Sequence, residues 1–283
     1  MSDRKAILVT GASSGIGETT AHILAERGFH VFAGVRRVED GERLAAAIGA
    51  RCTPVLIDVT DTTSIEDAAA AIAKAGGIFG LVNNAGVAVA APLEYLPIDE
   101  LRHQFEVNVF GALAVTQAML PLLRRSIGRI VNVGSIAGRS PFPFMGPYCS
   151  SKAALDSLTH ILRMELAPFD IHVSYIEPGS HKTPIWTRSG AHADELERAL
   201  PPLALDFYGK MLAGVRAIAQ TQAQRGGDPR EVALAIGDAL VARVPKARYT
   251  IGKDTRLRVA LGYVPTTLRE RLIARLIERA ARP

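Results

Sequence analysis

A tyrosine and a lysine four residues apart form the pair in this chain best suited to proton transfer. Tyr148 and Lys152 fall in a segment whose pattern predicts a helix, where residues four apart lie on one face and can meet. A phenol has a pKa of about 10, and a nearby ammonium group favours its ionised form. We therefore expect Lys152 to lower the pKa of Tyr148, which would then both donate and accept a proton. The alternative is a pair of surface residues at an ordinary helical spacing.

A glycine-rich loop near the start of the chain predicts a phosphate-binding site. Residues 10–17 read TGASSGIG; they follow an expected strand, Ala6 to Val9, and precede a helix running to Arg27. Glycine lets the backbone turn tightly and approach a pyrophosphate, and the free N–H groups at a helix start favour negative charge. A glycine-rich turn without a ligand is the alternative, but a strand before and a helix after are the context of a dinucleotide loop.

Two arginines at the end of the second expected strand indicate which dinucleotide binds. In a dinucleotide fold this position lies beside the adenosine ribose, where an acidic side chain would bind a free 2′-hydroxyl. The chain has Arg36 and Arg37 there and no acid. A guanidinium group is a permanently charged fork donor that suits a 2′-phosphate. We therefore expect NADP(H) to be preferred over NAD(H), the alternative being two arginines that only solvate a strand end.

The elements that must position these residues alternate between strands and helices. Short apolar runs rich in β-branched residues are separated by amphipathic segments of helical length, which is typical of repeated βαβ units. The pattern predicts an α/β fold, a doubly wound parallel sheet with helices on both faces. The expected strands are Ala6 to Val9, Val31 to Val35, Val55 to Ile57, Gly80 to Val82, Arg129 to Val133 and Ile171 to Ile176.

The last third of the chain departs from this rhythm. A stretch that opens at Pro184 and ends at Pro201-Pro202 is followed by helical patterns near 206–222 and 229–243. We interpret residues 184–227 as a substrate-loop excursion and 265–283 as a helical tail of one domain that spans 1–283. Tyr249 to Ile251 would add a strand to the same sheet, since an isolated strand has nothing to pair with.

Composition excludes several other classes of protein. The 283 residues are 48% hydrophobic and 22% charged, as in an ordinary soluble domain. The two cysteines, Cys52 and Cys149, have no partner at metal-ligand spacing, so neither a disulfide framework nor a metal site is expected. We find no apolar run of about 18–20 residues that would span a membrane. The N-terminus lacks the features of a secretory signal, so we expect a cytoplasmic protein.

Together these motifs resemble the short-chain dehydrogenase/reductase family. They occur in the family's order: the glycine loop, Asn83-Asn84-Ala85-Gly86, Ser135 ahead of Tyr148-x-x-x-Lys152, and Pro178-Gly179. The resemblance covers the chain up to about Ile251. Three local sequences are most similar to the retinol and hydroxysteroid dehydrogenase branch of this family: Phe142 to Cys149, Arg163 to Phe169 and Ile176 to Gly179.

The resemblance implies a role for each matching residue. Lys152 would also bind the nicotinamide ribose, Ser135 would polarise the substrate oxygen, and Asn108 would hold a water in a proton relay. Gly134 departs from the family, in which a second serine often precedes the catalytic one. The dinucleotide would be bound by Gly11, Ser13, Ser14, Gly15, Ile16, Gly17, Arg36, Arg37, Asp58, Val59, Asn84, Ala85, Gly86, Tyr148, Lys152, Pro178, Gly179 and Thr183.

Some of these residues also have a purely structural interpretation. Asp58 would touch the adenine ring by resemblance, but an Asp after a strand also caps a turn. Pro178-Gly179 would lie beside the nicotinamide carboxamide, but it also makes a simple turn. Ser135 and Asn108 are residue types that commonly cap helices or occupy turns.

Two classes of function are compatible with the fold. The first is an NADP(H)-preferring oxidoreductase that moves a hydride between nicotinamide and a carbonyl or alcohol of a steroid-, retinoid- or ketone-like substrate. The second is a non-catalytic dinucleotide-binding sensor or regulator, which would not need Ser135, Tyr148 and Lys152 together. The apolar run Phe142 to Met145 is expected to approach the reacting carbon, which favours a lipophilic ligand; the alternative is that these side chains only pack under the loop.

The expected partners are a small lipophilic substrate and other copies of this chain, with no nucleic acid. Family resemblance suggests a homodimer or homotetramer built through the helices around Asp99 to Arg124 and Tyr148 to Phe169. From Arg243 onward the chain has eleven Lys or Arg against three acids, and its last segment is amphipathic. A terminal helix of this kind usually docks by its apolar face, and contact with an anionic membrane is the less favoured alternative.

Overall fold

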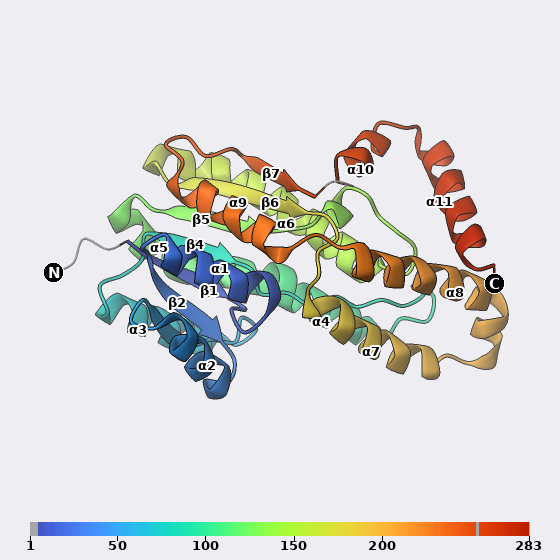
Figure 1. The fold of residues 1–283 in the computed structure, drawn as a ribbon, viewed down its shortest axis with the longest axis horizontal. Coiled ribbons are helices and arrows are strands. Elements are labelled where there is room, and N and C mark those ends of the chain that lie inside the picture. The colour runs from blue at the N-terminus through green and yellow to red at the C-terminus, as the bar shows by residue number, and fades with distance from the viewer. Residues whose placement is uncertain (1–4, 253–254, 283) are drawn as a thin grey trace.

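The computed structural model describes residues 5–252 and 255–282, which form a doubly wound α/β fold (Figure 1). One parallel sheet has the strand order β3-β2-β1-β4-β5-β6-β7. The expected α/β architecture is therefore confirmed, including the last strand, which pairs in parallel with β6. The strands are β1 Ala6–Thr10, β2 His30–Val35, β3 Cys52–Leu56, β4 Gly80–Asn83, β5 Arg129–Val133, β6 His172–Pro178 and β7 Arg248–Ile251.

The β3 strand begins earlier than the sequence pattern predicted. It starts at Cys52, three residues before the expected start at Val55, and it contains Pro54. β3 is an edge strand, and a proline is tolerated there because its missing N–H interrupts no central ladder. Thr53 and Pro54 are both exposed, so a search for a continuous apolar run finds only the end of this strand.

Alternation along the strands gives the sheet two buried faces. In β1, Ile7 and Val9 belong to one apolar cluster and Leu8 to the other. Helices α1 (Gly15–Glu26) and α9 (Pro229–Val241) cover the first face. The second face is covered by α3 (Thr62–Lys74), α5 (Ala112–Ser126) and α6 (Gly146–Leu166). α2 (Val38–Ile48) packs beside β2 and β3.

A long helical stretch on the second face is apolar enough to resemble a membrane span. Residues 98–126 comprise α4 (Ile98–Phe105), the π-helix η1 (Glu106–Gly111) and α5, and they meet the length and composition of a spanning segment. In the fold, however, Val115, Met119 and Leu123 on α5 are fully buried. Burial against the sheet accounts for their hydrophobicity, so we assign this stretch to the protein core.

The excursion after β6 is more helical than the sequence indicated. Helix α7 spans Pro184–Arg198, where no helix was expected, and α8 spans Pro202–Arg225, beginning before the expected start near residue 206. Each begins with a proline in its first turn. Proline lacks an N–H that the first turn does not use, and its fixed φ suits that position. The prolines therefore start helices here, whereas the sequence analysis treated them as breaks.

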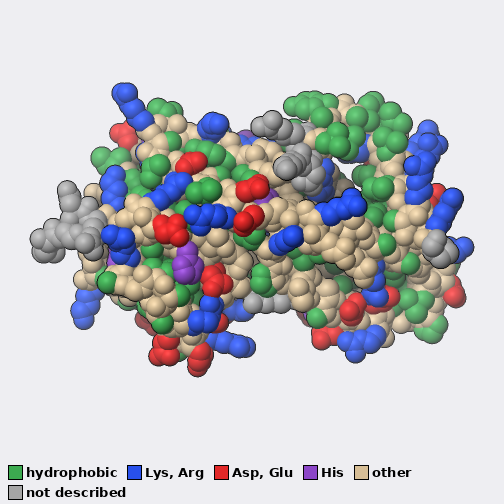
Figure 2. Space-filling view, in the orientation of Figure 1, with side chains coloured by type: hydrophobic (Ala, Val, Ile, Leu, Met, Phe, Trp, Pro, Cys, Tyr) green, Lys and Arg blue, Asp and Glu red, His purple; other side chains and the backbone are tan. Residues whose placement is uncertain are grey.

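The C-terminal segment docks onto the excursion. After α10 (Thr255–Leu261), helix α11 (Thr266–Ala280) packs against α8, with Ile277 buried. Docking by an apolar face is thus confirmed for part of that face, because Leu268, Leu272 and Leu276 stay about half exposed. Figure 2 shows hydrophobic side chains gathered at this end of the molecule beside a row of Lys and Arg side chains. The N-terminus was expected to lack a secretory signal; its first four residues are outside the described part of the chain.

The α8–α11 contact makes a testable prediction about a glycine. A Cβ at Gly214 would lie 2.3 Å from the carbonyl oxygen of Ile277, whereas a Cβ at Gly209 on the same helix meets nothing within 4 Å. Gly214→Ala should therefore displace α11 and destabilise its docking by about 1–3 kcal/mol. We expect limited trypsin digestion to cut the arginine-rich α11 faster in this variant.

Gly209→Ala is the matched control. It gains helix propensity of about 1 kcal/mol without a clash, so it should leave trypsin cleavage of α11 unchanged. Equal cleavage rates in the two variants would contradict the observed packing.

Candidate active site

A cavity of about 540 Å³ opens at the carboxyl ends of the strands, next to the point where the chain order reverses between β1 and β4. This is where ligands bind in doubly wound sheets. The cavity collects most of the residues that the sequence singled out. Its lining includes Gly11, Ser13, Ser14, Gly15, Ile16, Arg36, Asp58, Val59, Asn84, Ala85, Gly86, Ser135, Tyr148, Lys152, Pro178, Gly179 and Thr183.

The glycine loop is packed so closely that side chains would not fit. Gly11 and Gly15 have positive φ angles of 64° and 59°, a region that glycine adopts without steric cost. A Cβ at Gly17 would lie 2.2 Å from the carbonyl oxygen of Gly11. Gly17 is thus behind the cavity wall, where it lets α1 approach the loop.

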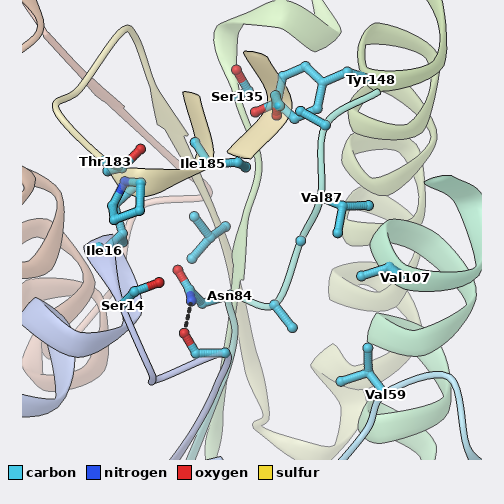
Figure 3. A pocket seen from close by; sticks show the side chains of 18 of the residues that line it. Ser14, Ile16, Val59, Asn84, Val87, Val107, Ser135, Tyr148, Thr183 and Ile185 are labelled. Carbon is cyan, nitrogen blue, oxygen red and sulfur yellow. Dashed lines mark hydrogen bonds between the residues drawn. The ribbon is translucent and has the colours of Figure 1, made fainter. Parts of the chain in front are cut away.

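The first turn of α1 is left open to an anion. Ser14 is its N-cap residue but makes no side-chain capping bond, so the N–H groups at the start of α1 remain available to a ligand. Asn84, the residue after β4, fixes the loop by donating hydrogen bonds from Nδ2 to the carbonyl oxygens of Thr10 and Gly11, at 3.0 and 3.2 Å. Figure 3 shows Ser14, Ile16 and Asn84 around this part of the cavity. The arrangement fits a dinucleotide pyrophosphate.

The two arginines do not lie equally close to the cavity. Arg36 lines it, whereas Arg37 is the exposed N-cap residue of α2 and is not part of the lining. Asp58 lines the same region and also caps its own turn, because its Oδ1 accepts hydrogen bonds from the N–H and hydroxyl of Thr60. Partial burial raises the pKa of Asp58, but the Thr60 hydrogen bonds and the charges of Arg36 and His103 outweigh it and hold the pKa below its usual range.

Three polar side chains are buried together at the other end of the cavity. Ser135 lies just after β5, and Tyr148 and Lys152 lie one turn apart on α6; all three are less than a tenth exposed. Figure 3 shows the hydroxyls of Ser135 and Tyr148 close together, with Ile185 on the opposite wall. The Lys152 Nζ is 5.8 Å from the centre of the Tyr148 ring and donates a 2.9 Å hydrogen bond to the Val133 carbonyl.

Burial is the main influence on the pKa values of Tyr148 and Lys152. The pKa of Tyr148 is raised because burial penalises the phenolate, although the hydrogen bond with Ser135 and the charge of Arg258 act in the opposite direction. Burial also lowers the pKa of Lys152 to about 8. The net shift of the Tyr148 pKa is therefore opposite in direction to the expected one. The sequence showed the spacing of the pair but not its desolvation.

Asn108 lies behind the cavity wall in the π-helix η1 and is almost completely buried. Its Oδ1 accepts a hydrogen bond from the Val87 N–H, while its Nδ2 donates to the Val87 carbonyl and to Ser151. A Cβ at Gly86 would lie 3.3 Å from Asn108 Oδ1 and 3.7 Å from Lys152 Nζ. An added Cβ would therefore be tight against Asn108 Oδ1 and in ordinary contact with Lys152 Nζ. The π-helix itself gave no signal in the sequence.

The wall opposite Tyr148 is not the one that the sequence indicated. Residues Phe142 to Met145 are not among those that line the cavity; Phe144 instead packs edge-to-face on Tyr208 of α8. The apolar wall comes from α7, with Ile185 and with Trp186, whose ring centre is 6.5 Å from that of Tyr148. Sequence reasoning missed these residues because it predicted no helix at α7.

Helix α7 also closes one side of the cavity through an ion pair. His192 Nε2 lies 2.9 Å from Glu100 Oε2 on α4, and both residues line the cavity. The hydrogen bond to Glu100 raises the pKa of His192, which favours its charged form. The cavity is therefore apolar near Tyr148 and polar where α7 meets α4.

The short chain dehydrogenase family model matches residues 5–194, the part of the chain that builds most of this cavity. The chain belongs to the short-chain dehydrogenase/reductase family. It is therefore an NAD(P)-dependent oxidoreductase that acts on a carbon–oxygen bond.

Relatives of this short-chain dehydrogenase match it over nearly its whole length. It is 40% identical to the uncharacterized oxidoreductase YusZ of Bacillus subtilis (strain 168), over 90% of this chain and 91% of the relative. It is 34% identical to the NADPH-dependent 3-dehydrocapnine reductase of Ornithobacterium rhinotracheale, over 94% of both. It is 33% identical to retinol dehydrogenase 5 of Homo sapiens, over 97% of this chain and 89% of that one.

Solved structures agree with the family assignment. A short-chain dehydrogenase from Streptomyces avermitilis superposes with a TM-score of 0.78 at 31% identity and covers 99% of both chains. The 3-ketoacyl-(acyl-carrier-protein) reductase from Brucella melitensis, complexed with NADH, has a TM-score of 0.71 at 27% identity, over 87% of this chain and 96% of that one. Nicotinamide dinucleotides of both kinds thus occur among similar proteins.

Proposed function

We propose that this dehydrogenase prefers NADP(H) and interconverts a carbonyl and an alcohol on a lipophilic substrate, with Tyr148 as its proton donor and acceptor. The observation that carries the proposal is the burial of Ser135, Tyr148 and Lys152 together at one end of a cavity whose other end fits a dinucleotide. A non-catalytic sensor of the same fold would bind the dinucleotide but would have no use for this set.

The chain's own residues supply the proton chemistry and the orientation. The nicotinamide, when bound, gives or takes the hydride. In reduction the Tyr148 hydroxyl donates its proton to the carbonyl oxygen, and Ser135 holds that oxygen by a hydrogen bond. In oxidation Tyr148 takes the proton back. Lys152 binds the ribose, and its pKa of about 8 leaves it able to exchange a proton near neutral pH, with Asn108 as the relay behind it.

The cavity wall supports a lipophilic substrate. Val87, Ile185 and Trp186 line the cavity, and the ring centre of Trp186 lies 6.5 Å from that of Tyr148. Small-ligand sites of this kind are mostly apolar with a few oriented polar groups. Two of the similar proteins are named for substrates of this character, retinol and 3-dehydrocapnine. A steroid-, retinoid- or ketone-like compound is therefore the substrate class to test first.

Tyr148→Phe tests the catalytic assignment. The ring remains but the transferable proton is lost, so turnover of the best substrate in a panel of ketones and alcohols should fall by about a hundredfold to ten-thousandfold, while dinucleotide binding is kept. The measurement is absorbance of the reduced nicotinamide. Tyr263→Phe, at a tyrosine that is 84% exposed, is the control.

The raised pKa of Tyr148 predicts how kcat/KM for alcohol oxidation depends on pH. Because burial raises the pKa of Tyr148 above its usual value of about 10, alcohol oxidation, which needs the phenolate, should have a kcat/KM that is still rising at about pH 10. Tyr148→Phe should lack this rise. A wild type that binds the dinucleotide but turns over no carbonyl or alcohol would instead favour the sensor.

Replacing the arginines tests the cofactor preference. Arg36 lines the cavity and Arg37 does not, so Arg36→Ala should raise the Kd for NADPH more than Arg37→Ala does. Loss of one charge-assisted hydrogen bond, about 1.5–3 kcal/mol, corresponds to about a tenfold to hundredfold change. The Kd for NADH should change little, and dinucleotide fluorescence measures both. Equal losses for the two dinucleotides would contradict the proposal.

A homo-oligomer is the second part of the proposal. The two segments expected at the interface carry exposed apolar side chains, with Phe110 54%, Ile161 42%, Met164 66% and Phe169 49% exposed. Apolar side chains gathered on a surface often mark a protein interface. We therefore propose a dimer or tetramer formed through η1, α5 and α6.

A double charge substitution tests this interface. Ile161→Glu with Met164→Glu should convert the oligomer to a monomer, since each new carboxylate would have to be desolvated. Light scattering at micromolar concentration measures the mass. Val244→Glu, at a residue 79% exposed outside these helices, should leave it unchanged. A monomeric mass for the unmodified chain would contradict the interface.

A further inference from the structure

The side chain that fills the space next to Gly134 is Tyr175 of β6. A Cβ at Gly134 would lie 1.9 Å from Tyr175 Cζ and 2.0 Å from its hydroxyl oxygen, so no other residue type fits there without displacing the ring. Tyr175 is fully buried. The departure from the family at Gly134 is thus coupled to a tyrosine on the neighbouring strand.

The hydroxyl of Tyr175 touches both elements that hold the reacting groups. It accepts a 3.3 Å hydrogen bond from the backbone N–H of Ser135 and donates a 3.1 Å hydrogen bond to the carbonyl oxygen of Lys152. The first contact is on the segment after β5 and the second is on α6. A single hydroxyl therefore links the backbone of Ser135 to the helical turn that carries Lys152.

Charged residues hold the Tyr175 ring in place. The guanidinium carbon of Arg248 lies 4.7 Å from the ring centre, within the range of a cation–π contact. Arg248 is fixed by Asp156 of α6 and by the buried Glu177 of β6, at 2.5 and 2.7 Å. With its ring confined between Gly134 and Arg248, the hydroxyl has little freedom to leave its two partners.

We propose that Tyr175 is a positioning residue that sets the spacing between Ser135 and the Tyr148–Lys152 face of α6. The proposal rests on the proposed function, because it assigns Tyr175 a role in the same reaction. Tyr175 is not among the residues that line the cavity. It acts through the backbone, and small misplacements of reacting groups cost rate more than binding.

Tyr175→Phe is the decisive variant because it removes the hydroxyl and keeps the ring. We expect kcat to fall about tenfold to a hundredfold, with the KM for the dinucleotide within about twofold of the wild-type value, as expected when transition-state interactions alone are lost. Hydrogen exchange of the segment around Ser135, followed by mass spectrometry, should become faster because the Ser135 N–H loses its acceptor.

Tyr249→Phe is the matched control. Tyr249 lies on the adjacent strand β7, and its hydroxyl accepts a hydrogen bond from the Lys246 N–H, away from Ser135 and Lys152. It should leave kcat and exchange around Ser135 unchanged. A kcat within about twofold of wild type in Tyr175→Phe, or an equal loss in both variants, would overturn the proposal.

A second pair of variants distinguishes the effect of steric crowding at Gly134 from the effect of losing the Tyr175 hydroxyl. Gly134→Ala should lower both stability and kcat by forcing the ring aside, and Tyr175→Leu in the same chain should recover stability but not kcat. Recovery of kcat without the hydroxyl would overturn the proposal. A wild type that turns over no substrate would overturn the proposed function alone. The positioning contact is tested separately by hydrogen exchange: an unchanged exchange rate around Ser135 in Tyr175→Phe would overturn it.

Discussion

Backbone-to-backbone packing at the carboxyl edge of the sheet is the constraint on which the rest of this structure depends. Gly17 brings α1 onto the loop at Gly11, and Gly11 in turn lies against Ala85, where a Cβ would be 2.8 Å from the Ala85 Cα. At the other end of the cavity a Cβ at Gly138 would be 2.9 Å from the carbonyl carbon of Lys152. These contacts leave no room for side chains at the three glycines, so the main chain fixes how closely the elements around the cavity approach one another.

The same edge concentrates buried polar groups, which must find partners where water is excluded. Glu177 is fully buried and is held by Arg139, Arg248 and the hydroxyl of Thr250. The buried Lys152 donates a 2.9 Å hydrogen bond to the Val133 carbonyl, and desolvation lowers its pKa to about 8. The buried carboxylate of Glu177 is thus balanced by two arginines. Lys152, with its lowered pKa, can gain or lose a proton near neutral pH.

The fold and most of the cavity could be predicted because local patterns encode them. A strand followed by TGASSGIG and a helix specifies a loop conformation that only glycine adopts easily, and continuous apolar runs in the strands specify a sheet buried on two faces. The order of the motifs then placed Ser135, Tyr148 and Lys152 at one end of the sheet, where the structure has them. Errors arose where a local signal has two meanings, as with Pro184 and Pro202, which begin helices.

The sequence alone therefore determined the family, the sheet and which residues meet in the cavity, since each depends on residue type and short-range spacing. Only the tertiary structure decided what surrounds them. It moved Phe144 onto Tyr208, put Trp186 in front of Tyr148, and raised the pKa of Tyr148 that the Tyr148–Lys152 spacing was expected to lower. The physical reason is that burial and packing at the cavity depend on segments distant in the chain, such as α7 and β6. A local sequence pattern does not predict that these segments pack there.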